Sequence, residues 1–539
     1  MAERVNRNMV GLFLSLLSSA TLLLSFPPFD IGVLAWAGLM PLFIVISSSS
    51  LWKGFVLSYI CGAFFFLGVF NWILSVSQYT MLHHAILAVY LGLYFGIFGL
   101  AFNFIYLRRG ITFAFFAAPF IWVSLEYIRS NLSFLALPWG LIGHTQYMYP
   151  DVIQVTALAG TYSISFMIVM VNAAIAAVVY ACLPRSGMHK QFRDKPFLKK
   201  ADLALIIIAA STSLFALQYG HWITSRPITG KRVKISAVQG NIDQAKKWDP
   251  KYAQEIMRAY ANLTQKASSQ KPALIIWPET ATPGSINRDP KLLGWLKEIA
   301  RGAQASIVLG SAQYRKFEKA EGNTFKYMNS AFLVTPGDQM SMIHQYNKIR
   351  LFPFGEYLPY KNIIPWDFIN VSSISEYMPG KKFTVFEHPD FRFAVTICWE
   401  NIFPDLVRQF VKRGAQFIVN ITNEARFGKS DAPYQLAGIS VFRAVENRIY
   451  VIRCSNTGIS CIIDPFGRIV KRLQDENGNE LFVRGILHGM IIPMGSKTFY
   501  TRNGDLVPIL AIAVSLVFIF IAWSKPLAKR KKARDVEGQ

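Results

Sequence analysis

The sequence predicts an integral membrane protein in which a bundle of α-helices carries a layered α/β domain outside the cytoplasm. Composition is the first observation: 52% of the 539 residues are hydrophobic and only 16% are charged, which is too apolar for an ordinary soluble protein. Distribution is the second, because residues 9–223 are almost continuously apolar whereas residues 231–497 resemble a soluble domain. The third is a last apolar run, Leu506 to Trp523, which precedes a basic tail.

Windows of about 20 apolar residues predict eight membrane spans. They are 9–26, 32–48, 56–76, 86–107, 111–129, 155–182, 203–223 and 505–523. The first could instead be a cleaved signal peptide, because Arg4 and Arg7 precede a short apolar core, although no convincing cleavage site follows before FPPFD. We expect a membrane domain at 1–226 with spans one to seven, a globular domain at 231–497, an eighth span at 505–523 and a basic cytoplasmic tail at 524–539.

The net charge of +24 is concentrated in a few loops rather than spread over a nucleic-acid-binding face. Lysines and arginines crowd the loop at 184–200 and the tail at 525–534, and fewer lie at the N-terminus, at Lys53 and at Arg108–Arg109. The alternate loops, 27–31 and 77–85, carry none. This positive-inside pattern predicts that both termini are cytoplasmic and that the globular domain lies outside. We expect the membrane as a partner and no nucleic acid.

The globular region alternates β-rich runs with amphipathic helical patterns, which is typical of a layered α/β architecture. The predicted strands are 233–239, 273–277, 306–312, 330–335, 393–398, 416–422, 450–455 and 461–465. The predicted helices are 250–268, 290–303, 403–413 and 433–447. Reactive side chains gather where the strands of such sheets end.

Three reactive residues follow apolar strands: Glu279, Lys348 and Cys398. An acid, an amine and a thiol are sufficient for covalent acyl transfer, because a thiol with a pKa near ~8.5 needs a base to become nucleophilic. Glu279 can act as that base, and Lys348 with the backbone N–H of Trp399 can stabilise an oxyanion. Each residue alone could equally be a strand-edge or salt-bridge residue, and sequence spacing does not prove that the three converge.

The remaining cysteines and the histidines do not suggest a metal or cofactor site. Cys61 and Cys182 lie in predicted spans, Cys454 and Cys461 lie in predicted strands, and we interpret all four as packing residues. No CxxC pair occurs, and the outer-loop residues His83, His84 and His144 lack ligand partners at metal-binding spacing. We therefore expect no metal and no cofactor.

Several motifs resemble those of the nitrilase, or carbon–nitrogen hydrolase, superfamily, and more narrowly those of the apolipoprotein N-acyltransferase family. They are WPET (277–280), YNKIRLFPFGEYLP (346–359), ICWEN (397–401) and RAVENR with SNTGIS (443–460). The resemblance covers the whole chain, since it includes APFIWVSLEYIRS (118–130), LPWGLIGHTQ (137–146) and VQGNIDQAKKWDP (238–250).

The resemblance implies an αββα sandwich on eight membrane helices and a role for each matched residue. Glu279 matches the general base, Lys348 the lysine that stabilises the intermediate, and Cys398 the nucleophile. Glu356 matches a supporting glutamate that orients the lysine. Glu400 is either a polar wall of the cleft or a supporting contact behind the catalytic residues, or else it is a plain structural acid.

Three tryptophans match substrate-binding positions of the family. Trp248 and Trp399 match positions near the substrate channel, and Trp139 matches a tryptophan near the membrane-side opening. Two aromatic and proline-containing segments, 350–366 and 369–380, could form a mobile interfacial lid or could simply pack on the domain.

The implied reaction is a ping-pong acyl transfer in the bacterial inner membrane, with the catalytic domain periplasmic. Cys398 would take a fatty acyl group from a phospholipid and pass it, from a thioester, to the α-amino group of an S-diacylglyceryl cysteine on an apolipoprotein. The alternative is a membrane-anchored amidase or nitrilase that hydrolyses a small amide. A transporter or scaffold is a further alternative, disfavoured because we expect no intramembrane acid that would mark an ion path.

The chain departs from the family pattern at two places. It has NEARFG (423–428) where the family often has an NDxWFG motif, so Glu424 and Arg426 replace an aspartate and an aromatic residue. Trp399 follows the nucleophile where tyrosine is commoner. These changes leave the Glu–Lys–Cys set intact, and their effect on the acyl donor stays open.

Overall fold

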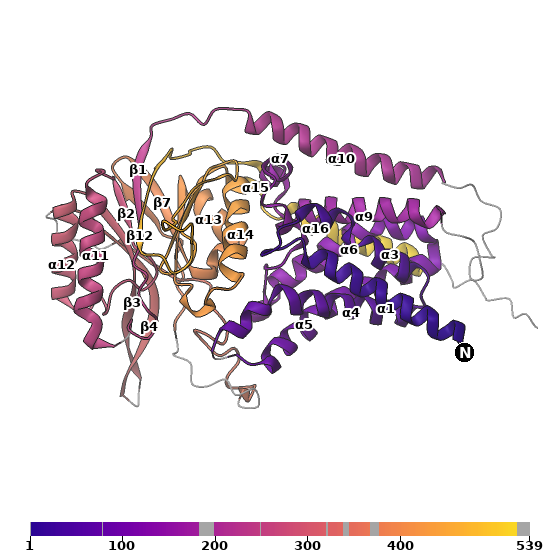
Figure 1. The fold of residues 1–539 in the computed structure, drawn as a ribbon, viewed down its shortest axis with the longest axis horizontal. Coiled ribbons are helices and arrows are strands. Elements are labelled where there is room, and N and C mark those ends of the chain that lie inside the picture. Colours follow the sequence, from indigo (N-terminus) through magenta and orange to yellow (C-terminus); the bar gives the residue numbers. More distant parts are fainter. Residues whose placement is uncertain are drawn as a thin grey trace, which may run out of the picture.

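A computed structural model describes residues 2–77, 79–182, 199–247, 249–319, 322–337, 344–366 and 377–524. Trp248, most of the basic loop at 184–200, most of the segment 369–380 and the tail from 525 lie outside the described residues. The protein has a helical half that begins at the N-terminus and an α/β half inserted between helices α10 (Lys200–Thr224) and α16 (Leu506–Trp523) (Figure 1).

Among the described residues of the helical half, six helices are long and apolar enough to cross a membrane. They are α4 (Leu51–Val69), α5 (Met81–Arg109), α6 (Ile111–Asn131), α9 (Tyr162–Cys182), α10 and α16. The first two predicted spans correspond to shorter apolar helices: α1 (Ala2–Leu23), whose apolar part is Asn8–Leu23, and the stretch Gly32–Ser47, which contains α2 (Ala35–Gly38) and α3 (Met40–Ser47). The multi-pass helical character is thus confirmed, and the number eight stays a prediction.

The expectation that the helical half contains no buried acid is wrong. Glu126, on α6, is 7% exposed, and its Oε1 accepts a hydrogen bond of 2.9 Å from the backbone N–H of Ile142. One turn later Arg129, also buried, donates to the carbonyl oxygens of Trp139 and Gly140 at 2.9 and 3.2 Å. The two charged side chains therefore hold the loop that follows α6.

The described part of the α/β half contains two six-stranded sheets. The first has the order β12-β1-β2-β3-β4-β5, with β1 (Val233–Gln239), β2 (Leu274–Ile276), β3 (Ser306–Lys319), β4 (Gly322–Val334), β5 (His344–Asn347) and β12 (Gly485–Ile491). The second has the order β11-β10-β9-β8-β7-β6, with β6 (Val385–His388), β7 (Phe391–Ile397), β8 (Phe417–Thr422), β9 (Tyr450–Ser455), β10 (Cys461–Ile463) and β11 (Ile469–Arg472).

Each sheet has three parallel strands at its centre, β1-β2-β3 in one and β7-β8-β9 in the other. Their valine- and isoleucine-rich runs are buried on both faces, as expected for parallel strands covered by other layers. Helices α11 (Ala253–Ser268) and α12 (Pro290–Ala303) cover the outer face of the first sheet (Figure 1). Helices α13 (Pro404–Lys412) and α14 (Ala432–Asn447) lie between the second sheet and the helical half. The α/β fold prediction is confirmed.

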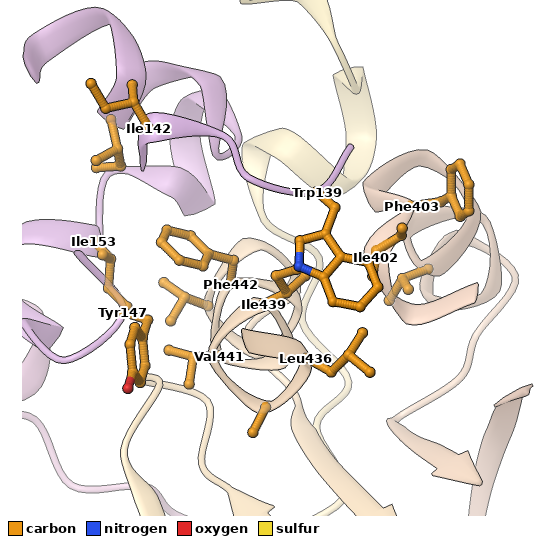
Figure 2. Packing of buried hydrophobic residues seen from close by; sticks show 14 of the residues in the cluster. Trp139, Ile142, Tyr147, Ile153, Ile402, Phe403, Leu436, Ile439, Val441 and Phe442 are labelled. Carbon is orange, nitrogen blue, oxygen red and sulfur yellow. The ribbon is translucent and has the colours of Figure 1, made fainter. Parts of the chain in front are cut away.

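The two halves meet at α14, every residue of which is buried apart from Tyr434. Figure 2 shows Trp139, from the loop after α6, beside Leu436 and Ile439 of α14, with Phe442 on the side toward Ile142. Polar contacts join the same surfaces, since Gln435 accepts a hydrogen bond of 2.7 Å from Trp139 Nε1 and donates one of 3.0 Å to the carbonyl of Val69. This packed interface fixes the position of the second sheet relative to the helical half.

Candidate active site

Cys398 lies where β7 ends and a short 3-10 helix (Cys398–Ile402) begins. Its φ is +57°, a left-handed conformation that residues other than glycine seldom adopt and that is common at functional turns. Asn420, on the neighbouring strand β8, donates a hydrogen bond of 3.1 Å to the carbonyl of Cys398 and another of 3.1 Å to Thr396 Oγ1. The thiol therefore belongs to a sharp turn that the Asn420 side chain fixes to the neighbouring strand β8.

The pKa of the Cys398 thiol is raised well above its usual value. Burial is the main cause, the carboxylates of Glu279 and Glu356 add to it, and the Lys348 ammonium and the Trp399 N–H oppose it. The resting sulfur is thus a protonated thiol and not a thiolate. A base must remove its proton as it reacts.

Lys348 follows β5 and is almost completely buried, with 1% of its side chain exposed. Its Nζ donates to Glu356 Oε1 at 2.9 Å. Burial alone would lower the pKa of this lysine, but the negative charge of Glu356 and the smaller effect of Glu279 raise the pKa above its ordinary value. Lys348 is therefore a permanent ammonium beside the nucleophile.

Glu279, three residues beyond β2, has a hydrogen-bond donor on each carboxylate oxygen. Asn329 Nδ2, on β4, donates to Oε1 at 2.7 Å, and the backbone N–H of Asn423, after β8, donates to Oε2 at 2.8 Å. The same Asn329 nitrogen also donates to Glu356 Oε1 at 3.1 Å. A continuous chain of hydrogen bonds therefore links Glu279 to Lys348 through Asn329 and Glu356.

A second lysine contacts the backbone of Glu279. Lys247 is 3% exposed, and its Nζ donates to the backbone carbonyl of Glu279 at 2.8 Å. Burial, opposed by the charge of Glu279, lowers the pKa of Lys247 to about 8. The Glu279 carboxylate thus acts electrostatically on two buried lysines, Lys247 and Lys348.

Glu400 is fully buried and accepts four hydrogen bonds. Its Oε1 accepts from Tyr346 OH and from the N–H groups of Ile349 and Arg350 at 2.7–3.0 Å, and its Oε2 accepts from Ile397 N at 2.8 Å. Burial, opposed by these donors, raises the pKa of Glu400 to about 7. The side chain ties the segment after Lys348 to the turn that holds Cys398, so the geometry favours a supporting contact over a wall of the cleft.

Two of the three tryptophans expected to bind substrate, Trp139 and Trp399, lie in the described residues, and both are buried against other side chains. Trp399 is 6% exposed, donates from Nε1 to the carbonyl of Arg350 at 2.7 Å and packs its ring against Phe352 and Phe403. Trp139 is 2% exposed and stacks on Trp72 at 4.8 Å. Trp248 lies outside the described residues. Their substrate-binding role stays a prediction.

The NEARFG departure has a structural explanation. Glu424 forms a buried ion pair with Arg453, and Arg453 donates to Asn420 Oδ1 at 2.8 Å, so the pair supports the residue that pins Cys398. The longer glutamate arm has room because position 458 is glycine: a Cβ there would lie 1.8 Å from Glu424 Oε2. The positive charge of Arg426 acts on two tyrosines, Tyr79 in the helical half and Tyr377 in the α/β half.

Sequence reasoning missed Asn329, Asn423 and Lys247. Asn329 is a polar residue within the strand YMNSAFLV, which was the only signal for it. Asn423 contributes a backbone N–H, which no side-chain pattern can reveal. Within the part of the chain that the structure describes, no cluster of three His, Cys, Asp or Glu side chains could hold a metal ion.

The two halves of the chain match two protein-family models. Residues 234–491 match the family Carbon-nitrogen hydrolase, and residues 18–174 match the family Apolipoprotein N-acyltransferase N-terminal domain. A solved structure of Saccharomyces cerevisiae Nit3, described as a member of branch 10 of the nitrilase superfamily, matches with a TM-score of 0.37 and 18% identity over 57% of this chain and 99% of that one. The family-model match, and not this structural likeness, identifies residues 234–491 as a carbon–nitrogen hydrolase domain.

Relatives match along almost the entire chain. The apolipoprotein N-acyltransferase of Geobacter metallireducens is 33% identical over 529 residues, covering 95% of both chains. That of Chlorobaculum tepidum is 28% identical over 537 residues, covering 95% of this chain and 96% of its own. The chain belongs to the apolipoprotein N-acyltransferase family.

Proposed function

We propose that this protein transfers a fatty acyl group from a membrane phospholipid, through a thioester on Cys398, to the α-amino group of the N-terminal S-diacylglyceryl cysteine of apolipoproteins. The observation that carries the proposal is a partly buried thiol flanked by Glu279 and Lys348, in a carbon–nitrogen hydrolase domain fixed to apolar helices. The family membership of the entire chain supports the same reaction.

In the first half-reaction, Cys398 Sγ attacks the carbonyl carbon of a phospholipid ester while Glu279 takes the thiol proton. The oxyanion of the tetrahedral intermediate is stabilised by the Lys348 ammonium and the Trp399 N–H. The intermediate then expels the alkoxide of a lysophospholipid, which takes the proton from Glu279. The acyl group is left as a thioester on the sulfur.

In the second half-reaction, the neutral α-amine of the acceptor attacks the thioester carbonyl. Glu279 takes a proton from this amine and returns it to the departing sulfur, so the enzyme regains its thiol and the product is an amide. Throughout both steps, Glu356 holds the Lys348 ammonium in position and Asn329 holds the Glu279 carboxylate. Glu400 holds together the turns that carry Lys348 and Cys398. Trp139, Trp248 and Trp399 are proposed to line the path of the acyl chains.

The helices let the acyl chains remain in the bilayer during the reaction. Each buried methylene contributes ~0.8 kcal/mol, so drawing a sixteen-carbon chain into water would cost roughly 10 kcal/mol. We propose eight spans, with residues 1–226 as the membrane domain, 231–497 as an αββα sandwich and 505–523 as the last span. Two six-stranded sheets between helix pairs support the sandwich.

We also propose that the catalytic domain is periplasmic, in the inner membrane of a bacterium, and that both termini are cytoplasmic. The N-terminus lies at the end of the bundle away from the α/β half (Figure 1). Basic side chains gather around helix ends there: Lys53 Nζ donates to Asn8 Oδ1 at 2.8 Å, and Arg109 Nε donates to the carbonyl of Ile521 at 2.8 Å. Such charges favour the cytoplasmic side.

The test is product analysis with the full-length protein in phospholipid nanodiscs and a synthetic diacylglyceryl-cysteine peptide. We expect an N-acylated peptide and a lysophospholipid in equal amounts from the wild type, and neither product from Cys398→Ala or Cys398→Ser, both still folded and membrane-inserted. Free fatty acid as the main product would instead identify an acyl hydrolase.

A further inference from the structure

The thiol and the base belong to different sheets, so their separation must be set by contacts between the sheets. Glu279 follows β2 of the first sheet, and Cys398 follows β7 of the second. Both are held by residues 420–423, at the end of β8. Asn420 Nδ2 donates to the carbonyl of Cys398 at 3.1 Å, and the backbone N–H of Asn423 donates to Glu279 Oε2 at 2.8 Å. These two contacts anchor the thiol and the base to one short segment.

A single buried arginine holds both ends of this segment. Arg453 lies beside Asn420 in the parallel pairing of β9 with β8 and is almost completely buried. Its Nη1 donates to Asn420 Oδ1 at 2.8 Å, which leaves the Asn420 amide nitrogen to face the Cys398 carbonyl. Its Nη2 pairs with the carboxylate of Glu424, the residue directly after Asn423. One guanidinium therefore reaches both anchors.

The glutamate end of the pair is itself fixed. Glu424 is buried, and its Oε2 accepts from the backbone N–H of Ile459 at 3.3 Å. Burial raises the pKa of Glu424, and the charge of Arg453 opposes that rise. Asn456 Nδ2 donates to Asn423 Oδ1 at 3.1 Å and so holds the same turn from a third direction. A displacement of Arg453 would therefore be transmitted to the backbone at Asn423.

We propose that Arg453 is a positioning residue that sets the separation of the Cys398 thiol and the Glu279 carboxylate, an inference that rests on the acyl transfer proposed above. Arg453 acts on the thiol through Asn420. It acts on the carboxylate through Glu424 and the backbone of Asn423. A planar guanidinium can serve both partners at fixed geometry, whereas a lysine offers a single point charge. Because a misplacement of about 1 Å lowers a rate by about 10²-fold, the pair contributes to the rate as well as to stability.

Replacing the complete ion pair separates positioning from stability. A buried ion pair can be exchanged for apolar residues of similar volume with little loss of stability, whereas removal of one partner leaves an uncompensated buried charge. We therefore expect Arg453→Met/Glu424→Leu to unfold thermally close to the wild type. Arg453→Lys is a second variant, which keeps the charge and loses the planar fork. The matched control is Arg472→Met/Glu480→Leu, which removes an ion pair of 3.0 Å at the edge strand β11.

The rate at which iodoacetamide alkylates Cys398 reports the proton transfer without any lipid. It is measured between pH 6.5 and 8 on the full-length protein carrying Cys182→Ser, because Cys182 is exposed. In the wild type, Glu279 takes the proton as the carbon–sulfur bond forms and iodide leaves, so we expect a nearly constant rate. The Arg472/Glu480 control should have the same rate and profile.

In both Arg453 variants we expect alkylation about 10–100-fold slower at pH 7. The rate should then rise about tenfold per pH unit, because the displaced base no longer assists and the pKa of Cys398 lies well above this range. Thioester formation from phosphatidylethanolamine should be slowed by the same factor, with an unchanged phospholipid concentration for half-maximal rate. A structural role alone would leave the pH profile of the folded variants flat.

Two outcomes overturn the role of Arg453 while leaving the acyl transfer intact. One is a folded double variant with the rate and pH profile of the wild type; the other is an equal loss in the Arg472/Glu480 control. If the double variant does not fold, Arg453→Lys decides by the same criterion. A tenfold rise per pH unit in the wild type itself would refute proton removal by Glu279, and it would overturn the proposed mechanism together with the role of Arg453.

Discussion

Lys246 and Lys247 are neighbours in sequence with opposite environments. Lys246 is 40% exposed and pairs with Glu255 at 3.1 Å, as an ordinary surface lysine does. Lys247 turns inward to the carbonyl of Glu279. The sequence KKW could not show which of the two is buried, because the choice depends on where the loop after β1 meets the end of β2.

We expect Lys247→Met to slow thioester formation about tenfold at pH 7, because the ammonium favours the negative charge of the adjacent base and buried charge-assisted contacts contribute roughly 1.5–3 kcal/mol. The pKa of Lys247 is about 8, so the wild type loses this ammonium as the pH rises through 8. The advantage of wild type over Lys247→Met should therefore shrink between pH 7 and 9. Lys246→Met is the matched control and should behave as the wild type, whereas a pH-independent deficit in Lys247→Met would indicate a purely structural lysine.

Lys348→Met should leave the protein folded and nearly inactive. The methionine keeps the volume of the side chain but removes the charge that stabilises the oxyanion, and loss of one such donor lowers the rate by about 10²–10³-fold. Single-turnover acylation with a neutral ester measures this loss directly. Turnover within a few-fold of wild type would make Lys348 a structural residue.

Among the elements, the parallel strands β2 and β7, which precede Glu279 and Cys398, belong to the most predictable part of the fold. The predicted strand 233–239 coincides with β1, and the predicted helix 290–303 coincides with α12. Long aliphatic runs and a clear amphipathic period explain this agreement. The strands β6, β11 and β12 were missed because they are short, partly exposed or glycine-containing, and they form only through pairing with distant segments.

Convergence of the site depends on the approach of β3 to the turn after β2. A Cβ at Gly310 would lie 2.6 Å from the Cα of Glu279 and 2.6 Å from the backbone nitrogen of Thr280. Gly310→Ala should therefore displace Glu279, destabilise the protein by about 1–3 kcal/mol and lower activity more than stability alone explains.

Gly294→Ala provides the control for this glycine. A Cβ at Gly294, on α12, meets nothing within 4 Å, so alanine should be neutral or stabilise the helix by about 0.5–1 kcal/mol. Thermal unfolding in detergent, together with acylation rates, measures both variants. Equal behaviour of the two alanine variants would contradict the proposed tight contact at Gly310.

The complete molecule joins a half made of long apolar helices to an α/β half that contains the candidate active site. The sequence predicted the division into a membrane domain and a globular domain, and it predicted the three reactive residues. It could not show that these three residues lie close together in the folded protein. Distances between residues on two sheets depend on the order of the strands, which the sequence does not show. Asn329 links Glu279 to Glu356, but in the sequence it is only a polar residue within an otherwise apolar strand.

The proposed topology predicts which surfaces a membrane-impermeant maleimide reaches. Asn477→Cys, at an exposed turn of the α/β half, should be labelled in intact spheroplasts. Asn8→Cys, near the start of α1, should be labelled only after lysis. Both variants are made in a Cys182→Ser/Cys398→Ala background, because Cys182 is exposed and Cys398 is partly exposed, whereas the other three cysteines are buried. The reversed labelling pattern would place the α/β half in the cytoplasm.

The most direct measurement is intact-mass and peptide mass spectrometry of the protein after incubation with phospholipid and no acceptor. We predict a single fatty acyl adduct on Cys398, labile to hydroxylamine, which disappears as an added diacylglyceryl-cysteine peptide becomes N-acylated. An adduct at another residue, or peptide acylation by Cys398→Ala, would contradict a thioester at this sulfur.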